Sequence, residues 1–459
     1  MSAARVGTVP DMDAQPETEP RPRTRRPRIV IAGGGLVGLV TAWRLQRELR
    51  AGEAEVTVIN PHNYMVYQSL LPEVASGMLE PSDVVVALRP TLARTRILVG
   101  SITGLDTDRR VVTVEPIESE PRDLPYDHLV LALGSHTRVL PIPGLTEHSV
   151  GFKTVPEALF LRDHVLSRLE AAAHTTDPAA RSRALTFVFV GGGYSGVEAL
   201  GELQTMAAEA CALYRDLRPE HQRWVMVEAT ERILPMVDDS LAGYATAALR
   251  RRGVDVRLET TVESVDDGVV ALSDGDELST DTLVWAAGVA PHPLVADLGV
   301  PTNDIGAVEV DATLRVTGTT DLWAAGDCAA VPDLVQGGTC PPSAQYSLRE
   351  ARVLAKNLAA SIRGAGLTPF AYRQIGEMLT LGHHQGVGQI YGRQMSGLLP
   401  WYLRRLYHVA RIPSVRRKLD VWTEWTLRLI FGREVVSLGS IRRPGVPLEE
   451  ATSTQSRSG

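Results

Sequence analysis

Short apolar runs that end in glycine or a polar residue recur along the chain and predict an α/β fold. The first run, Ile29 to Ala32, suits a strand buried on both faces of a parallel sheet. A helical stretch follows to about Arg50, and the next run, Val56 to Ile59, ends at Asn60. Further strands are expected at 126–134, 184–190, 224–227, 281–288 and 320–327. This alternation predicts doubly wound parallel sheets.

A glycine fingerprint follows the first predicted strand. Gly33, Gly35 and Gly38 form G-x-G-x-x-G, the pattern that lets a dinucleotide pyrophosphate approach the start of a helix. Asn60, at the end of the second strand, can reach a ribose hydroxyl. A glycine-rich turn alone is a weak signal. Strand, glycines, helix, second strand and polar tip in this order predict a dinucleotide site.

The same order recurs in the middle of the chain. Gly191, Gly193 and Gly196 follow the strand predicted at 184–190, and the strand at 224–227 leads to Glu228. A carboxylate there accepts hydrogen bonds from the adenosine ribose and repels a 2′-phosphate, which favours NADH over NADPH. An exposed strand-end glutamate without a ligand is the alternative. Two such fingerprints predict two nucleotide-binding units rather than a short-period repeat.

Three later features extend this picture. Gly288 ends the run 281–288, where we expect the chain to cross back to the first unit. Asp327 follows a buried run and either binds a polyol or caps the next segment. Ser343 suits an N-cap, and Gln345 to Leu358 suits a helix.

Composition and charge restrict the class of protein. The 459 residues carry a net charge of −7, which argues against nucleic acid as the main partner. No apolar run reaches the roughly 18 residues of a membrane-spanning helix. Cys211, Cys328 and Cys340 form no C-x-x-C pair and no zinc-ligand spacing. We therefore expect a reduced cytosolic chain without a metal site or dithiol chemistry.

The segment 393–433 differs from the rest of the chain in charge. Asp420 and Glu424 are its two acidic residues, and it holds three of the seven tryptophans. Its nine basic residues are Arg393, Arg404, Arg405, Arg411, Arg416, Arg417, Lys418, Arg428 and Arg433. After Pro413, helical spacing relates Val415, Leu419, Trp422, Thr426 and Leu429. A basic helix with such anchors predicts an interfacial membrane helix. The alternative is a helix packed on its own domain or on a twin subunit.

Several stretches resemble the two-dinucleotide flavoproteins and, more closely, the type II NADH:quinone oxidoreductases. These are single-subunit, non-pumping NADH dehydrogenases. The matching segments are 63–64, 68–71, 191–202, 227–235, 324–329, 342–346 and 412–419. The first glycine fingerprint is generic, whereas the last two segments are specific. The resemblance covers about residues 28–438.

The resemblance implies which residues contact the nucleotides. FAD would contact Gly33, Gly35, Gly38, Asn60, Gly134, Asp327, Ala344 and Gln345, with Asp327 on the ribityl chain. NADH would contact Gly191, Gly193, Ser195, Gly196, Glu228 and Gly288. Asn60 departs from the acidic residue that is usual in the family, so a ribose hydrogen bond there would lack charge assistance.

The resemblance also implies Glu198 and Gln345 as catalytic residues. Glu198 would lie where nicotinamide and flavin meet and serve in proton delivery or quinone reduction, while an acid that stabilises the helix dipole is an equal alternative. Gln345, Tyr346 and Arg349 would contact the quinone, with residues 378–382 bordering a tunnel. Arg349 stands where the family often has a second glutamine.

These features together predict an α/β protein with two Rossmann-like domains, the second inserted in the first, and a C-terminal amphipathic helical membrane-binding segment. The expected parts are an FAD-binding domain (28–150 and 286–370), an NADH-binding domain (151–285), a membrane- and quinone-associated region (371–445) and disordered tails (1–27 and 446–459). Their boundaries follow from where the predicted strands and crossings fall along the chain.

The expected activity is FAD-dependent oxidation of NADH by a membrane quinone, without proton pumping. The protein would lie at the cytoplasmic face of the cell membrane on anionic lipid, with menaquinone as a family-based guess and a homodimer as an option. One alternative is a soluble NADH-dependent reductase of a ferredoxin or small molecule. Another is an NADH-binding flavoprotein that acts as a redox sensor.

Overall fold

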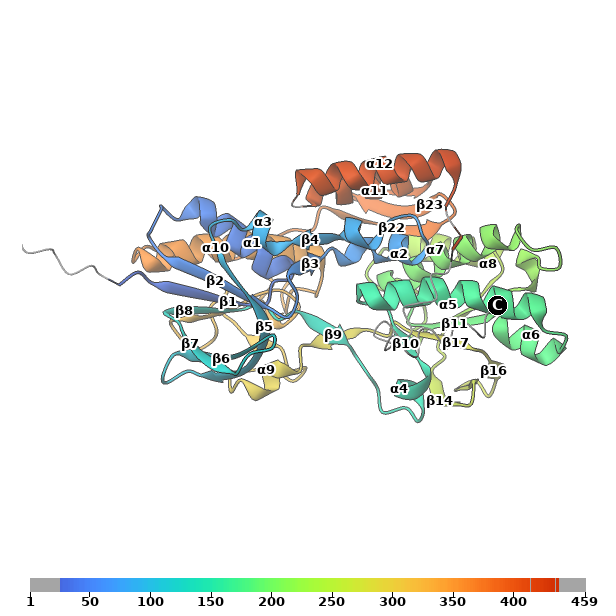
Figure 1. Ribbon diagram of the computed structural model, residues 1–459, viewed down its shortest axis with the longest axis horizontal. Helices are drawn as coiled ribbons and strands as arrows, with labels where there is room; N and C mark the ends of the chain where they lie inside the picture. The colour runs from blue at the N-terminus through green and yellow to red at the C-terminus, as the bar shows by residue number, and fades with distance from the viewer. Residues whose placement is uncertain (1–24, 413, 434, 437–459) are drawn as a thin grey trace, which may run out of the picture.

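The computed structural model describes residues 25–412, 414–433 and 435–436, and Figure 1 shows two lobes beneath a pair of C-terminal helices. The tail predicted at 446–459 and residues 1–24 of the other predicted tail lie outside the described residues. The left lobe in Figure 1 contains the N-terminal strands, and the right lobe contains the middle of the chain. Each lobe is built around one main sheet.

A seven-stranded sheet forms the left lobe, in the order β20-β8-β1-β2-β5-β6-β7. The bounds are β1 (Arg28–Ala32), β2 (Glu55–Asn60), β5 (Arg96–Asp106), β6 (Val111–Pro116), β7 (Arg122–Pro125), β8 (His128–Leu131) and β20 (Leu322–Ala324). β1 runs parallel to β2 and β8, and β8 runs parallel to β20. Helix α1 (Leu36–Glu48) packs on α10 (Ala344–Ile362) beside this sheet. The apolar run at β1 is therefore buried, as predicted.

A parallel five-stranded sheet forms the right lobe, in the order β10-β17-β11-β12-β13. Its strands are β10 (Val150–Gly151), β11 (Thr186–Val190), β12 (Arg223–Val227), β13 (Val254–Arg257) and β17 (Thr282–Trp285). The main helices of this lobe are α5 (Val155–His174), α7 (Tyr194–Cys211) and α8 (Asp239–Arg251). Every strand of this sheet falls between β8 and β20 in the chain.

All seven predicted strands are present, and those predicted at 126–134, 281–288 and 320–327 are shorter because their glycine-containing ends turn out of the sheet. The strand predicted from residue 184 begins at Thr186, since α6 (Pro178–Ala184) occupies the preceding residues. Smaller elements are β3 (Tyr64–Val66), α2 (Leu71–Ala75), η2 (Pro81–Val84), β4 (Val85–Ala87), α3 (Leu88–Thr91), β9 (Ser135–Thr137), α4 (Leu145–His148), β14 (Val262–Asp266), β15 (Val269–Leu272), β16 (Glu277–Ser279), β18 (Val289–Pro291), α9 (Leu294–Asp297), β19 (Val308–Glu309) and β21 (Ala329–Ala330). The 3-10 turns η1 (Gln68–Leu70) and η3 (Pro219–His221) complete the set.

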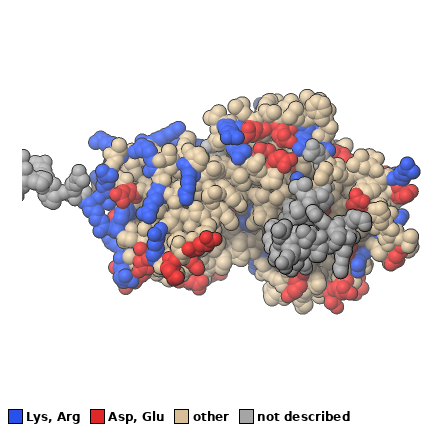
Figure 2. Space-filling model, viewed as in Figure 1, with Lys and Arg blue, Asp and Glu red and all other residues tan. Residues whose placement is uncertain are grey.

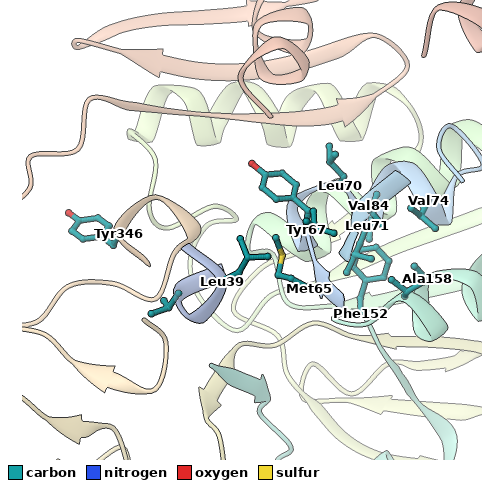
Figure 3. Close-up of a cluster of buried hydrophobic side chains, with 14 of the residues drawn as sticks. Leu39, Met65, Tyr67, Leu70, Leu71, Val74, Val84, Phe152, Ala158 and Tyr346 are labelled. Carbon is teal, nitrogen blue, oxygen red and sulfur yellow. The ribbon is translucent and has the colours of Figure 1, made fainter. Parts of the chain in front are cut away.

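The core is continuous between the lobes. Helix α2 of the left lobe packs against α5 and α7 of the right lobe. Figure 3 shows Leu71 and Val74 of α2 near Phe152 and Ala158 of the right lobe. All four side chains are buried. Apolar burial therefore holds the two sheets in one orientation.

The C-terminal region adds a small antiparallel sheet and two helices. They are β22 (Gly376–Gly382), β23 (Gln385–Ile390), β24 (Arg393–Gly397), α11 (Leu398–Arg411) and α12 (Val415–Phe431). The sheet lies against α7 without intervening side chains. A Cβ atom at Gly201 would lie 2.3 Å from the Leu381 carbonyl oxygen, and one at Gly382 would lie 2.0 Å from the Gly201 oxygen. Glycine at both positions is what permits this approach.

Helix α12 matches the helix predicted from Val415, whereas the small sheet and α11 were not predicted. Within the described ranges, no helix is both long enough and apolar enough to cross a bilayer. Figure 1 shows α11 and α12 above the junction of the two lobes. The C-terminal region therefore lies against both lobes.

Candidate active site

The two glycine fingerprints have the same backbone geometry. Gly33 and Gly191 have φ values of +108° and +106°, and a Cβ atom at either would lie within 2.5 Å of a backbone oxygen. At Gly38 and Gly196 a Cβ atom would lie 1.8 Å and 2.0 Å from the oxygen of the respective first glycine. These four glycines are required by the turn and by close helix–strand packing, as the fingerprint predicts.

The central glycines have a different reason to be glycine. No protein atom lies within 4 Å of a Cβ atom built on Gly35 or Gly193. They are the N-caps of α1 and α7, and neither helix has a side-chain cap. The first N–H groups of both helices are thus available, and the space in front of them suits a pyrophosphate. Ser195 is exposed in the first turn of α7.

The polar residues that end β2 and β12 bind the glycine loops. Asn60 Oδ1 accepts a hydrogen bond from the Gly34 N–H at 2.8 Å, and Glu228 Oε2 accepts one from the Gly192 N–H at 2.6 Å. Glu228 is half-buried and Oε1 also accepts from the N–H and hydroxyl of Thr230. These hydrogen bonds hold Glu228 at the glycine loop, and its contact with a ribose stays a prediction. Asn60 and Glu228 occupy equivalent positions in the two lobes.

Asp327 lies in a polar chain beside the first nucleotide site. Its Oδ2 accepts a hydrogen bond from the Ser135 hydroxyl at 2.7 Å, and Ser135 Oγ accepts one from Lys153 Nζ at 2.8 Å. Burial lowers the pKa of Lys153, while the charge of Asp327 opposes this shift. Gly134, just before Ser135, has φ +72° and open space around its Cβ position. Gly288 is exposed, and its carbonyl accepts from the Arg138 N–H.

The turn that presents Asp327 is held from α10. Glu350 is buried, and its carboxylate accepts a hydrogen bond from the Gly326 N–H at 2.6 Å. Gly326 has φ +77°, and a Cβ atom there would lie 2.6 Å from Val37 of α1. Burial raises the pKa of Glu350 to about 7. The Asp327 turn is therefore fixed from two helices.

Glu198 belongs to a buried charge network that joins three parts of the molecule. Arg404 of α11 contacts Glu198 of α7, with Nε–Oε1 at 2.7 Å and Nη2–Oε2 at 3.0 Å. Arg404 Nη1 lies 2.5 Å from Oε1 of Glu73 in α2. The three residues are 7% exposed or less. One guanidinium thus pairs with the carboxylates of both α2 and α7.

The hydrogen-bond partners of Glu198 lie outside its own helix, and its catalytic role stays a prediction. Its Oε1 accepts a hydrogen bond from the Thr380 N–H at 2.9 Å, so its partners come from β22 and α11 rather than from its own helix. Burial raises the pKa of Glu198 to about 7, with Arg404 opposing the shift and Glu73 adding to it. A carboxyl group with this pKa exchanges a proton near neutral pH.

The predicted quinone residues lie at the start of α10. Ser343 is the N-cap, and its hydroxyl accepts from the Tyr346 N–H, as predicted. Gln345 Nε2 donates to the Gly376 carbonyl at 2.9 Å, and its Oε1 accepts from the Tyr372 hydroxyl at 3.2 Å. The Arg349 guanidinium lies 4.0 Å from the centre of the Tyr372 ring. Gln345 and Arg349 therefore share Tyr372 as a partner.

Ala344 and Tyr346 differ in exposure. Ala344 is exposed at the first turn of α10. Tyr346 is buried, with its ring edge-on to Tyr372 at 5.1 Å between centroids. Figure 3 shows Tyr346 well apart from Tyr67 and Leu39. In this conformation the Tyr346 ring packs against the Tyr372 ring and supports it.

Sequence reasoning missed several residues of the site. Arg404 and Glu73 belong to no motif. The one available signal was the pair Arg404-Arg405 within a stretch rich in Leu and aromatic residues. Lys153 was signalled by composition, since it is one of three lysines in a chain with 44 arginines. Glu377 hydrogen-bonds the Tyr194 hydroxyl beside the second fingerprint, and burial raises its pKa to about 7. Nothing in the pattern around Glu377 pointed to it.

Comparison with known proteins identifies the family. The sequence profile of the pyridine nucleotide-disulphide oxidoreductases matches residues 27–347. The chain is 28% identical to a type II NADH:quinone oxidoreductase of Mycobacterium tuberculosis over 91% of both chains. It is 30% identical to a demethylphylloquinone reductase of Synechocystis, over 88% of this chain and 96% of that one.

The chain belongs to the type II NADH:quinone oxidoreductases. Among solved structures, it is similar to NDH2 of Plasmodium falciparum in complex with NADH, with a TM-score of 0.82 and 19% identity, over 90% of this chain and all of the other. That likeness shows a shared fold. As a member of the type II NADH:quinone oxidoreductases, the protein is an FAD-dependent enzyme that uses NADH.

Proposed function

We propose that this protein oxidises NADH with bound FAD and delivers the two electrons to a membrane quinone, without pumping protons. The observation that carries the proposal is the doubled nucleotide site. Two loops of equal geometry each leave open space at the central glycine, and Asn60 ends one strand where Glu228 ends the other. Two nucleotide sites in one chain suit transfer from one bound nucleotide to another.

The residues of the first loop fit FAD. Gly35 and the free N–H groups at the start of α1 would hold its pyrophosphate, and Asp327 would hold the ribityl chain with Gly134 beside it. Asn60 has its side-chain oxygen engaged by Gly34, so its contribution to the ribose would be a neutral hydrogen bond. FAD, when bound, accepts hydride from NADH and passes two electrons on. Gln345 and Ala344 would border its ring at the start of α10.

The residues of the second loop would hold NADH. Gly193 and Ser195 would bind the pyrophosphate at the start of α7, with Gly191 and Gly196 setting the turn. Glu228 would accept from the adenosine ribose hydroxyls and exclude a 2′-phosphate by charge. Gly288 would border the nicotinamide end. We propose this lobe, residues 151–285, as an NADH-binding domain inserted into an FAD-binding domain of 28–150 and 286–370.

Glu198 would hold the proton that quinone reduction requires. Its Oε1 and Oε2 meet Thr380 and Arg404, and its pKa of about 7 allows both states at neutral pH. Glu198→Gln should lower the rate of quinone reduction and remove its pH-dependent step near 7. The rate of flavin reduction by NADH should stay within about twofold, because proton transfer contributes only to quinone reduction. Stopped-flow absorbance across pH 5.5 to 8.5 measures both rates. Equal pH profiles for the two proteins would exclude this role.

Gln345 and Arg349 would contact the quinone, and Tyr346 would support them through Tyr372. The amide of Gln345 can exchange the Gly376 carbonyl for a quinone oxygen, since both are acceptors for its Nε2. Arg349 supplies positive charge at the same place, with its Nη1 on the Gln345 carbonyl at 2.8 Å. Residues 378–382 of β22 would form the neighbouring wall beside Glu198.

The C-terminal region, 371–445, would bind the protein to the membrane as a peripheral enzyme. Residues 413, 434 and 437–445 of it lie outside the described residues. Exposed apolar side chains on α11 and α12 form one set, which we call the terminal apolar surface: Leu398, Leu399, Tyr402, Val415, Leu419, Trp422, Leu429, Ile430 and Phe431. The side chains related by the helical spacing predicted for α12 are thus exposed, whereas Val421 and Trp425 are buried. A surface of this composition suits a bilayer interface.

The charges of this region contribute less than the sequence predicted. Arg404 and Arg405 are buried, the latter between the rings of Trp401 and Trp425. Arg417, Arg428 and Arg433 form ion pairs with acidic residues. Figure 2 shows charged residues along one flank of α12 and an uncharged outer edge. Fewer than nine basic residues are therefore free to meet lipid, and apolar contact should dominate binding.

We propose that the protein binds the cytoplasmic face of the cell membrane through an anionic lipid surface. Menaquinone is the proposed quinone substrate. A homodimer through the terminal apolar surface is the competing use of the same residues. Vesicle co-sedimentation and sedimentation velocity of the same sample separate the two uses. Binding to vesicles by a monomer would support the membrane assignment.

The decisive experiment compares electron acceptors. Purified FAD-loaded protein is given NADH with a soluble quinone analogue, with a ferredoxin or with oxygen alone. Turnover with the quinone that exceeds the other two by an order of magnitude is expected for the enzyme proposed here. Preferred reduction of the ferredoxin would indicate a soluble reductase, and slow turnover with every acceptor would indicate a sensor. Proteoliposomes with an internal pH dye test the absence of pumping.

A further inference from the structure

Four arginines lie on α1 and α10, which pack together, and at the end of α11. They are Arg44 of α1, Arg349 and Arg352 of α10, and Arg411, the last residue of α11. We call them the arginine cluster. All four are half-buried. Burial lowers the pKa of Arg352, and the charges of Arg44, Arg411 and Arg349 lower it further.

Within the described ranges, no carboxylate pairs with the arginine cluster. Arg349 donates to a backbone carbonyl and lies on a tyrosine ring. Arg44 lies 5.4 Å from the Trp43 ring centre, and Arg411 lies 5.2 Å from that of Tyr407. Arg257 is a contrast, since its guanidinium pairs with three aspartates. The positive charges of the arginine cluster are therefore not neutralised by a direct ion pair with any described residue.

Two donors of the arginine cluster are buried without a hydrogen-bond partner. They are Nε of Arg44 and Nε of Arg352. A buried charged donor without an acceptor is strongly unfavourable, and repulsion between like charges adds to the cost. An anion with several oxygens would satisfy the donors and neutralise the charges at once. A carboxylate offers two oxygens, whereas a phosphate group offers three or more to several guanidinium forks.

We propose that Arg44, Arg349, Arg352 and Arg411 bind a phosphate group, carried by an anionic phospholipid or free in solution. The position favours the lipid. Arg411 ends α11, and Val415, four residues on, belongs to the terminal apolar surface. A headgroup could thus reach the arginines while its chains meet the apolar surface.

The proposal is tested without NADH or quinone, so its outcome can be distinguished from that of the proposed redox function. The variants are Arg44→Gln, Arg352→Gln and their combination in the full FAD-loaded chain. Arg349 is left unaltered because it belongs to the proposed quinone site. Arg47→Gln is the matched control, since Arg47 is on the same helix but is exposed and lies 4.1 Å from the Trp43 ring centre.

Melting temperature is measured in dihexanoyl phosphatidylglycerol below its micelle concentration, in inorganic phosphate and in sodium chloride of equal ionic strength. The unaltered protein and Arg47→Gln should show a saturable rise with the lipid that chloride does not give. Each cluster variant should weaken this binding by about tenfold or more. A rise with inorganic phosphate as well supports a site for phosphate from either source, and a rise with the lipid alone supports a headgroup site.

Two outcomes would overturn the proposal. One is a melting temperature that neither phosphate source raises above the chloride control. The other is a rise in melting temperature that the cluster variants and Arg47→Gln all keep, or all lose, to the same degree. A second readout comes from ligand-free buffer, where Arg352→Gln should melt no lower than the unaltered protein because it removes a repelled charge. A marked loss of stability there would make the arginine cluster a structural element instead.

Discussion

Removing Arg404 should destabilise the protein in a pH-dependent way. Arg404→Met keeps most of the side-chain volume but leaves Glu73 and Glu198 buried without a counter-charge. Breaking a buried ion pair from one side costs about 3–5 kcal/mol. With about 2–4 °C lost per kcal/mol for domains of 150–250 residues, the melting temperature should fall by on the order of 10 °C at pH 8.

The sign of the pH dependence follows from the carboxyl groups. Burial already raises the pKa of Glu198 to about 7 with Arg404 present, and removing the guanidinium raises it further. A folded pKa above the unfolded value of about 4.3 means that the folded state binds protons that the unfolded state releases. The loss should therefore be small near pH 4 and grow as the pH rises through 7.

The assay is thermal denaturation of the FAD-loaded protein between pH 5 and 8.5, followed by circular dichroism and by flavin fluorescence. The variant Arg404→Met/Glu73→Gln/Glu198→Gln carries no buried charge at this position and should recover much of the loss at pH 8. An Arg404→Met protein as stable as the unaltered one at pH 8 would refute the reasoning. A loss of equal size at every pH would show that packing, not charge, is responsible.

Three further predictions concern substrate and membrane. Glu228→Ala should narrow the kcat/KM preference for NADH over NADPH by about tenfold or more, because no carboxylate then repels the 2′-phosphate; equal use of both nucleotides by the unaltered protein would contradict this. Gln345→Ala should slow reoxidation of reduced flavin by quinone more than flavin reduction by NADH in stopped-flow traces, and the reverse order would remove Gln345 from the quinone site. Leu419→Glu with Trp422→Glu should release the protein from anionic vesicles in co-sedimentation, since each buried side chain contributes about 1.5–3 kcal/mol, whereas Ile117→Glu, at an exposed position outside the C-terminal region, should not.

The nucleotide loops could be predicted because their determinants are local. A turn with φ above +100° at Gly33, and a helix packed on its strand at Gly38, are requirements that the sequence records within a few residues. The same holds for the Ser343 cap. Such features depend on neighbours along the chain, so pattern and structure agree.

The charge network could not be predicted, because its members are distant in the sequence. Glu73, Glu198 and Arg404 meet only after α2, α7 and α11 pack together. The count of basic residues in the C-terminal segment also could not reveal which of them pair with acids far away in the sequence. Arg404 belongs to the buried network and Arg433 pairs with Glu209 of the right lobe, so the basic total overstated what lipid could meet.

The shared guanidinium of Arg404 has a consequence for how the protein comes apart. Two nucleotide-binding lobes with separate sheets would ordinarily melt as separate units. Here, separating α2, α7 or α11 from the other two leaves a buried charge without its partner, because one cation neutralises the carboxylates of α2 and α7. Partial unfolding at this junction therefore costs free energy whichever of the three elements moves. The molecule should therefore unfold as a single cooperative unit, and its lobes should keep a fixed relative orientation during turnover.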